Sequence, residues 1–252
     1  YKRQMILNAM LGITRIFVMW SKGEASANRV ADVLALPQDL TTLPGSEPEK
    51  NAPHIEFRDV NFSVRAGEVL GVSGLMGAGR TEIMQAIFGN LPTVAGKVFI
   101  EGKEVSIKNP RQAIAAGIGF ITEDRKTEGL LLEKSIAENI ELANLGKVSD
   151  NSVLSRKKGA ELVKRGIEEF RIKCFGPDHE CGNLSGGNQQ KVVLAKWIYT
   201  DPKILILDEP TRGVDIGAKK EIYNVINEMA AKGVAVIMVS SELPEVLGMS
   251  CL

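Results

Sequence analysis

The spacing of hydrophobic positions changes near residue 54 and divides the chain into an N-terminal part and an α/β part. Residues 5–20 form one nearly unbroken apolar run of 16 residues, slightly shorter than the ~20 that a helix needs to cross a bilayer. Two interpretations stay open for residues 1–36. They are the end of a truncated transmembrane helix that continues into a second helix, or an amphipathic or core helix of a soluble protein. Residues 37–53 carry four prolines and no periodicity, which predicts a linker.

From residue 54 onward, short apolar runs alternate with amphipathic helical patterns. The runs predict strands over residues 55–62, 68–73, 97–100, 118–121, 203–207 and 234–239, with a turn after residue 100 that completes a hairpin. Helical patterns cover residues 82–88, 109–117, 155–170 and 218–231, residues 131–200 lean helical as a whole, and residues 122–129 form a polar loop. Ser135 and Glu138 match a capping box. This alternation predicts an α/β fold with a mainly parallel, layered sheet.

Composition narrows the function classes. Lys plus Arg and Asp plus Glu both number 31, so the formal net charge is zero, which argues against a nucleic-acid binder that relies on bulk positive charge. Cys174, Cys181 and Cys251 form no C-x-x-C pair, which disfavours a structural zinc site and fits a reduced cytoplasmic compartment. We expect no secretory signal, because no small-residue cleavage site follows the apolar run.

A glycine-rich stretch, GLMGAGRT at residues 74–81, lies between an apolar strand and a helical pattern. Its spacing is that of the phosphate-binding motif G-x-x-x-x-G-K-[ST], with Arg80 in the lysine position. Glycines let backbone N–H groups converge on an anion, the helix N-terminus adds positive charge, and the Thr81 hydroxyl is placed to bind Mg²⁺. The alternative is an ordinary tight turn. The predicted nucleotide contacts are Gly74, Gly77, Ala78, Gly79, Arg80, Thr81 and Glu82.

A second candidate anion site opens the helical pattern that begins near residue 186. Ser185, Gly186 and Gly187 would present a hydroxyl, bare N–H groups and a helix N-terminus to an anion. The alternative is a serine that only caps the helix.

Two acidic residues end a strongly apolar strand. Asp208 can hold Mg²⁺ through water, and Glu209 can orient or deprotonate a water molecule. The alternative is a solvated strand end, which we disfavour because the order and spacing of the three motifs agree.

In order and spacing, these motifs resemble those of the ABC ATPase family. Residues 63–252 resemble the second, C-terminal ATPase half of monosaccharide importers of the ribose and galactose type, on the strings at residues 74–82, 123–126, 184–190, 208–215 and 239–245. The resemblance implies an α/β P-loop NTPase fold over residues 54–252, with a RecA-like parallel-sheet core, an antiparallel β-subdomain and a helical signature subdomain at about residues 131–200. It also implies ATP and Mg²⁺ as cofactors.

Residues 1–62 resemble instead the last transmembrane helix and the first ATPase strand of type I ABC exporters. The stretches EASANRVADVL at residues 24–34 and IEFRDVNFS at residues 55–63 carry this resemblance. The aromatic-bearing loop that stacks on adenine in the family is missing where the two resemblances meet, and Val64 stands where the exporter type has tyrosine. We therefore expect a recombined or truncated product.

Three positions depart from an active ABC site. Arg80 replaces the lysine, Glu123 stands where the family's Q-loop has glutamine, and Ser241 stands where most members carry the switch histidine. A carboxylate at position 123 would repel the γ-phosphate unless Mg²⁺ or protonation offsets it. All three departures weaken γ-phosphate handling, so we expect weak binding or binding without efficient turnover. The resemblance assigns catalytic positions to Glu209, Asp208, Ser241 and Glu123, and metal positions to Thr81, Asp208 and Glu123.

The stretch at residues 184–190 has no such departure. In ABC dimers each nucleotide lies between the phosphate loop of one half and this signature of the other. Ser185, Gly186, Gly187 and Gln189, with Asp215 in the D-loop, would therefore serve a partner half.

The resemblance implies an ATP-binding subunit of a sugar importer, peripheral on the cytoplasmic face of the inner membrane. Its implied partners are a second ATPase half, permease subunits that contact the loop after Glu123 and, indirectly, a periplasmic sugar-binding protein. Two alternatives stay open: a nucleotide-binding regulatory module without turnover, and the ATPase part of an exporter half-transporter.

Overall fold

The structure is a computed structural model that describes residues 61–74, 77–93, 95–151 and 153–250. Contacts divide the chain after His54, and all of these residues belong to the unit Ile55–Leu252. The predictions for residues 1–36 and 37–53, and most of the strand expected over residues 55–62, lie outside the described residues. No helix in the described part of the chain is long and apolar enough to cross a membrane.

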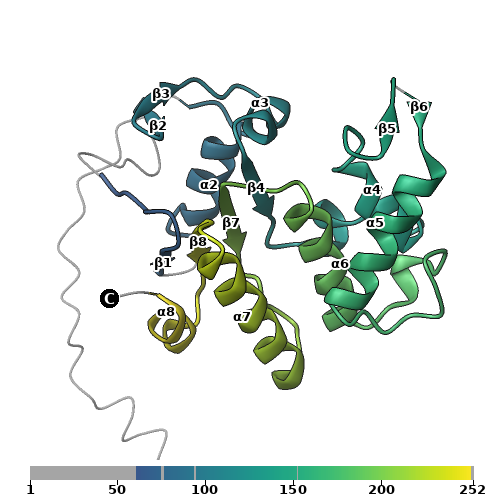
Figure 1. Cartoon of the computed structure of the whole chain (residues 1–252). Helices are drawn as coiled ribbons and strands as arrows, with labels where there is room; N and C mark the ends of the chain where they lie inside the picture. The colour runs from purple at the N-terminus through teal and green to yellow at the C-terminus, as the bar shows by residue number, and fades with distance from the viewer. Residues whose placement is uncertain (1–60, 75–76, 94, 152, 251–252) are drawn as a thin grey trace, which may run out of the picture. The chain divides into compact units, whose positions relative to one another are not determined.

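A four-stranded parallel sheet forms the centre of the fold, in the order β1-β8-β7-β4 (Figure 1). The strands are β1 (Val69–Val72), β4 (Ile118–Ile121), β7 (Ile204–Asp208) and β8 (Ala235–Val239). β4, β7 and β8 are almost completely buried, so their sequences are continuous apolar runs without alternation. Because the strands are parallel, the loops that follow all four leave from one edge of the sheet, which we call the carboxyl edge.

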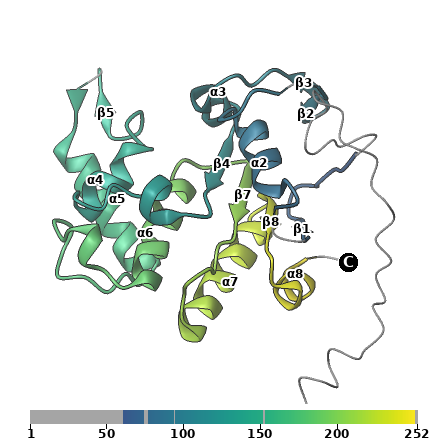
Figure 2. The ribbon, with the colours of Figure 1, turned by 180° about the vertical axis from the view of Figure 1, so that it is seen from behind.

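Side chains of β7 alternate between two buried clusters, one on each face of the sheet. Ile206 belongs to a cluster with Phe88 of α2 (Arg80–Phe88) and Ala113 of α3 (Pro110–Ala115). Its neighbours Leu205 and Leu207 belong to the other cluster, which includes side chains of α7 (Ile216–Ala231) and α8 (Leu243–Met249). Helices therefore cover the sheet on both faces (Figures 1 and 2).

A small hairpin confirms the turn predicted after residue 100. β2 (Val98–Ile100) and β3 (Lys103–Val105) pair antiparallel. The turn has φ values of 51° at Glu101 and 76° at Gly102. This hairpin is the described part of the expected antiparallel β-subdomain.

A helical part lies beside the sheet and confirms the prediction for residues 131–200. It contains α4 (Ile136–Leu142), α5 (Arg156–Glu169), the 3₁₀ turn η2 (Cys181–Asn183) and α6 (Gly186–Ile198). The predicted capping box starts α4, because the Glu138 N–H donates to Ser135 Oγ over 3.1 Å and the Ser135 N–H donates to the Glu138 carboxylate over 2.9 Å.

Two local elements differ from the prediction. β5 (Ser149–Asp150) and β6 (Val153–Leu154) form an antiparallel ribbon within the helical part, too short to show any periodicity in sequence. The polar loop expected over residues 122–129 contains a π-helical turn, η1 (Arg125–Gly129). Asp124 initiates this turn, since its carboxylate accepts the N–H of Lys126 over 2.8 Å, a bond that also lowers the pKa of Asp124.

Candidate functional site

The glycine-rich stretch connects β1 to α2 at the carboxyl edge. Gly77 and Gly79 both have φ of 79°, in the left-handed region that glycine adopts without strain. Gly79 is the N-cap of α2, and no side chain caps that helix end, so its first N–H groups remain available to an anion. A Cβ on Gly77 would have no atom within 4 Å, which leaves room for a ligand against the backbone.

Hydrogen bonds tie the ends of β1, β7 and β8 together directly beside this loop. The Ser240 N–H donates to the Val72 carbonyl over 3.1 Å, and the Glu209 N–H donates to the Val239 carbonyl over 2.9 Å. Glu209 and Ser241 therefore start from fixed positions next to the glycine-rich loop.

Three groups converge on the Glu209 carboxylate. It accepts the Ser241 N–H over 2.7 Å and the Ser241 hydroxyl over 3.2 Å. Nη1 of Arg80 lies 3.8 Å from Glu209 Oε1, and these two side chains are only 12% and 11% exposed. Glu209 also has φ of 47°, an unfavourable backbone conformation for a residue with a side chain, which concentrates at functional sites. The Glu209 carboxylate therefore accepts two hydrogen bonds from Ser241 and lies near the Arg80 guanidinium, whose Nη1 makes no hydrogen bond.

Asp208 presents an unpartnered carboxylate in the same place. The residue is 0% exposed, and neither carboxylate oxygen has a hydrogen-bond partner. Burial raises the pKa of Asp208, and the Thr81 hydroxyl offsets part of the rise. A buried carboxylate without a partner needs one, and Mg²⁺ binds proteins through one or two such oxygens together with substrate phosphates. Asp208 and Thr81 therefore fit Mg²⁺.

Ser185 lies at the exposed N-terminus of α6. Its hydroxyl makes no capping bond to the helix and instead accepts a hydrogen bond from Nδ2 of Asn188 over 2.9 Å, so the side chain does not cap α6. Gly187 is required by close packing, since a Cβ there would lie 2.9 Å from Cβ of Ala218 in α7. The signature is therefore packed against α7 while its serine stays at the surface.

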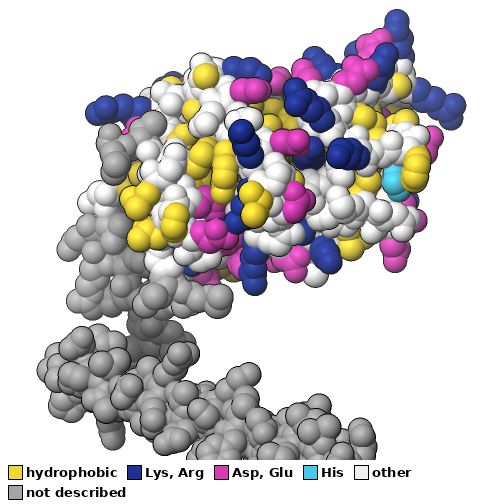
Figure 3. All heavy atoms as spheres, turned by 90° about the horizontal axis from the view of Figure 1, so that it is seen from below, with side chains coloured by type: hydrophobic (Ala, Val, Ile, Leu, Met, Phe, Trp, Pro, Cys, Tyr) yellow, Lys and Arg dark blue, Asp and Glu magenta, His cyan; other side chains and the backbone are white. Residues whose placement is uncertain are grey.

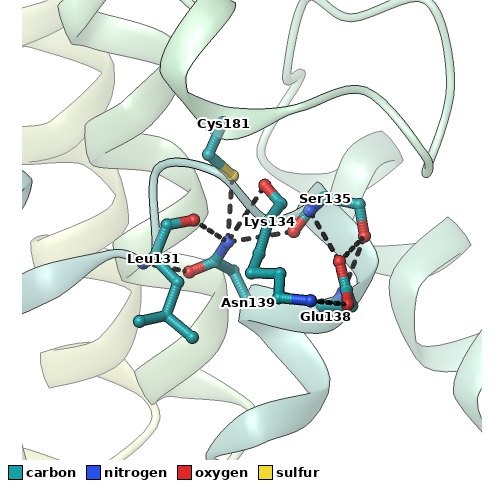
Figure 4. Close-up of polar contacts among 6 residues, drawn as sticks. All are labelled: Leu131, Lys134, Ser135, Glu138, Asn139 and Cys181. Atoms are coloured by element: carbon teal, nitrogen blue, oxygen red, sulfur yellow. Dashed lines mark hydrogen bonds and ion pairs between the residues drawn. The ribbon is translucent and has the colours of Figure 1, made fainter.

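A buried asparagine holds the turn that leads into this signature (Figure 4). Nδ2 of Asn139 donates to the carbonyls of Leu131 and Ser135, both over 2.9 Å, and to Sγ of Cys181 over 3.3 Å. Its Oδ1 accepts the Leu131 N–H over 2.8 Å. The Cys181 N–H in turn donates to the Lys134 carbonyl over 2.9 Å. The segment after η1 is therefore fixed to the turn that precedes Ser185.

Comparison with known proteins decides the family. A family model described as ABC transporter matches residues 57–212, more than half of the chain. The chain belongs to the ABC transporter family.

Curated ABC relatives share high identity with this chain over part of their length. Ribose import ATP-binding protein RbsA of Bacillus subtilis is 59% identical over 194 residues, which are 77% of this chain and 39% of that protein. The protein of the same name from Halalkalibacterium halodurans is 57% identical over 195 residues, with the same coverage. The chain thus spans about two fifths of the length of these relatives.

Solved ABC cassettes share the fold. The ADP conformation of an ATP-binding cassette of an ABC transporter has a TM-score of 0.61 at 26% identity and covers 76% of this chain and 77% of that chain. A nucleotide-free cassette has a TM-score of 0.62 at 27% identity and covers 75% of this chain and 76% of that one. The predicted P-loop NTPase fold of the ABC ATPase type is confirmed.

The ABC domain brings some predicted site residues together and separates others. Arg80, Asp208, Glu209 and Ser241 gather at the carboxyl edge with Thr81, and Glu82 is exposed in the first turn of α2. Glu123 forms an ion pair with Arg212. Asp215 is exposed and caps α7 by accepting the Ala218 N–H over 2.9 Å. Gln189 is 4% exposed and donates to the Cys181 carbonyl over 3.1 Å, so its side chain points into the helical part and away from the exposed serine.

Sequence reasoning missed one buried acid in this ABC site. Glu245 of α8 is 7% exposed and accepts the Thr211 hydroxyl over 2.8 Å and the Ser240 hydroxyl over 2.5 Å. It connects the segment after Glu209 with the end of β8. The sequence shows only a glutamate in an amphipathic helical turn, and a glutamate in such a turn normally faces solvent.

Proposed function

We propose that this chain is the ATP-binding half of an ABC importer for a monosaccharide of the ribose type. Its own phosphate loop would bind nucleotide with little turnover, and its signature would complete the nucleotide site of a partner half. Support for the sugar class is the identity of 57–59% to proteins named ribose import ATP-binding protein. The sugar itself would never contact this chain.

The convergence of Arg80 and Ser241 on Glu209 is the observation that carries the proposal. A general base must offer a free carboxylate oxygen to water. Here a guanidinium lies 3.8 Å from one oxygen, and the Ser241 N–H and hydroxyl donate to the carboxylate. Two of the three residues that depart from the family pattern thus contact the carboxylate that would activate water.

The remaining site residues retain a binding role. The N–H groups at the start of α2 bind phosphate, and Thr81 with Asp208 would hold Mg²⁺, which supplies charge neutralisation when bound. Ser185 and Asp215 are exposed, as residues that act on a partner's nucleotide must be. The proposed assembly includes a second ATPase half, permease subunits and a periplasmic sugar-binding protein, at the cytoplasmic face of the inner membrane. The face in Figure 3 mixes acidic and basic side chains without one dominant sign.

The test compares two single substitutions in the assembled transporter. We expect Ser185→Ala to lower the ATPase rate at least about tenfold, equivalent to about 1.4 kcal/mol, because it removes a group that acts on the partner's nucleotide. Glu209→Gln should change the rate less than about twofold, because Arg80 and Ser241 already engage that carboxylate. The exposed Ser63→Ala is the matched control. A large loss with Glu209→Gln and none with Ser185→Ala would overturn the proposal.

The ion pair between Arg80 and Glu209 also favours a second candidate, a nucleotide-binding regulatory module without any transport role. The two candidates differ in the response to sugar. An importer subunit increases its ATPase rate when loaded binding protein is added to the assembled complex, whereas a regulatory module binds nucleotide without such a response.

A further inference from the structure

Two arginines and a glutamate fasten the start of η1 and the residues just before it to the turn after β7. Nη1 of Arg125 donates to the Arg212 carbonyl over 2.7 Å, and Nη2 donates to the Gly213 carbonyl over 3.3 Å. In the opposite direction, the Arg212 guanidinium forms an ion pair with Glu123. The contacts are therefore reciprocal: each of the two segments contributes one guanidinium and binds the guanidinium of the other segment.

The same guanidinium also contacts the signature. A Cβ on Gly186 would lie 2.7 Å from Nη2 of Arg125 and 3.2 Å from the Gly213 carbonyl oxygen. Arg125 thus lies between the start of α6 and the D-loop, and occupies space that any side chain at position 186 would need. Burial lowers the pKa of Arg125, so holding this charge here has a cost that its carbonyl contacts must offset.

We propose that Glu123, Arg125 and Arg212 form a clasp that sets the spacing between the signature and the D-loop of this chain. Arg125 and Arg212 act in this clasp as positioning residues, because they fix Ser185 and Asp215 relative to each other. This inference rests on the proposed function, in which both groups act on the nucleotide of the partner half.

The geometry explains why arginine is needed at position 125. Its rigid fork reaches two carbonyls at once, 2.7 Å and 3.3 Å away, whereas the lysine ammonium is a compact point charge on a flexible stem. Lysine should therefore restore one contact and part of the spacing. Methionine at this position keeps most of the apolar stem and loses both contacts.

The experiment uses the assembled transporter with Arg125→Met, Arg125→Lys and, as control, Arg111→Met, which removes a guanidinium from an exposed position in α3. Hydrogen–deuterium exchange at residues 211–218 and 185–190 measures how readily the two segments that the clasp holds open locally. We expect Arg125→Met to accelerate exchange there about tenfold, equivalent to about 1.4 kcal/mol, and Arg125→Lys to lie between it and the wild type. The control should match the wild type.

Kinetics supply a second readout. The kcat for ATP should fall about tenfold in Arg125→Met with KM changed less than twofold, because the partner's own phosphate loop is untouched. Arg212→Met, at an exposed side chain, should show the same split if the substitution at position 125 fails to fold. Unchanged exchange and unchanged kcat in folded variants would overturn the clasp. If Ser185→Ala lowers the rate and the clasp variants do not, the clasp alone fails; if Ser185→Ala has no effect, the proposed function fails.

Discussion

Replacing Asn139 by aspartate tests how the signature turn is held, because the two side chains have the same shape. The substitution removes the Nδ2 donor that reaches the Leu131 and Ser135 carbonyls, both at 2.9 Å, and presents an oxygen to those carbonyls instead. Each lost hydrogen bond costs about 1 kcal/mol. Burying a carboxyl at a site that is 0% exposed adds a desolvation cost, and we expect a total loss of roughly 3 kcal/mol at neutral pH.

Urea unfolding followed by circular dichroism measures this loss. With a slope of about 2–3 kcal/mol/M, the midpoint should fall by roughly 1 M. Burial beside carbonyl oxygens raises the folded-state pKa of the introduced carboxyl above its unfolded value of about 3.9. The destabilisation should therefore be smallest near pH 4 and grow as the pH rises toward 7.

The control is Asn224→Asp on the exposed surface of α7, where we expect a change within about 0.5 kcal/mol. A loss below about 1 kcal/mol at Asn139, or one that is independent of pH, would refute the idea that its donor holds the turn.

Three further predictions concern buried groups. Burial raises the pKa of Cys181 from 9.0 to about 11, so the contribution of this thiol to stability should be constant below pH 9 and fall as the pH rises toward 11. An alkylating reagent at pH 8 should modify Cys174 and spare Cys181, as measured by mass spectrometry. Asp208→Asn should raise stability in Mg²⁺-free urea unfolding by about 1 kcal/mol, because it removes an unpartnered buried charge, and should abolish Mg²⁺-dependent nucleotide binding measured by calorimetry. Gly187→Ala should lower stability by roughly 1–3 kcal/mol, because the new methyl group would lie 2.9 Å from Cβ of Ala218. Adding Ala218→Gly to the same chain should restore part of the lost stability. Full tolerance of Gly187→Ala alone would contradict the packing argument.

The sequence predicted the sheet and the glycine-rich loop because both depend on local patterns. β4, β7 and β8 are continuous apolar runs, and the glycines at positions 77 and 79 take the positive φ that their spacing implies. The place of Asp208 and Glu209 followed from their position at the end of an apolar strand.

The contacts between distant segments could not be read in this way. Arg125 binds carbonyls 87 and 88 positions away, and backbone carbonyls carry no side-chain signature in a sequence. Arg80 was recognised as a departure from the motif, but its partner Glu209 became visible only when α2 and β7 were placed side by side. Gln189 was grouped with Ser185 because both belong to the stretch that resembles the family signature, and helical geometry turns its side chain to the buried side of α6.

The hydrogen bonds that join the strand ends make the phosphate loop, Glu209 and Ser241 parts of a single rigid block. Because Ser240 is bonded to Val72 and Glu209 to Val239, none of these groups can shift without breaking a bond that extends the sheet. Two connections, residues 122–135 and 199–203, join this block to the helical part, so a change in the distance from the block to Ser185 has to bend both of them.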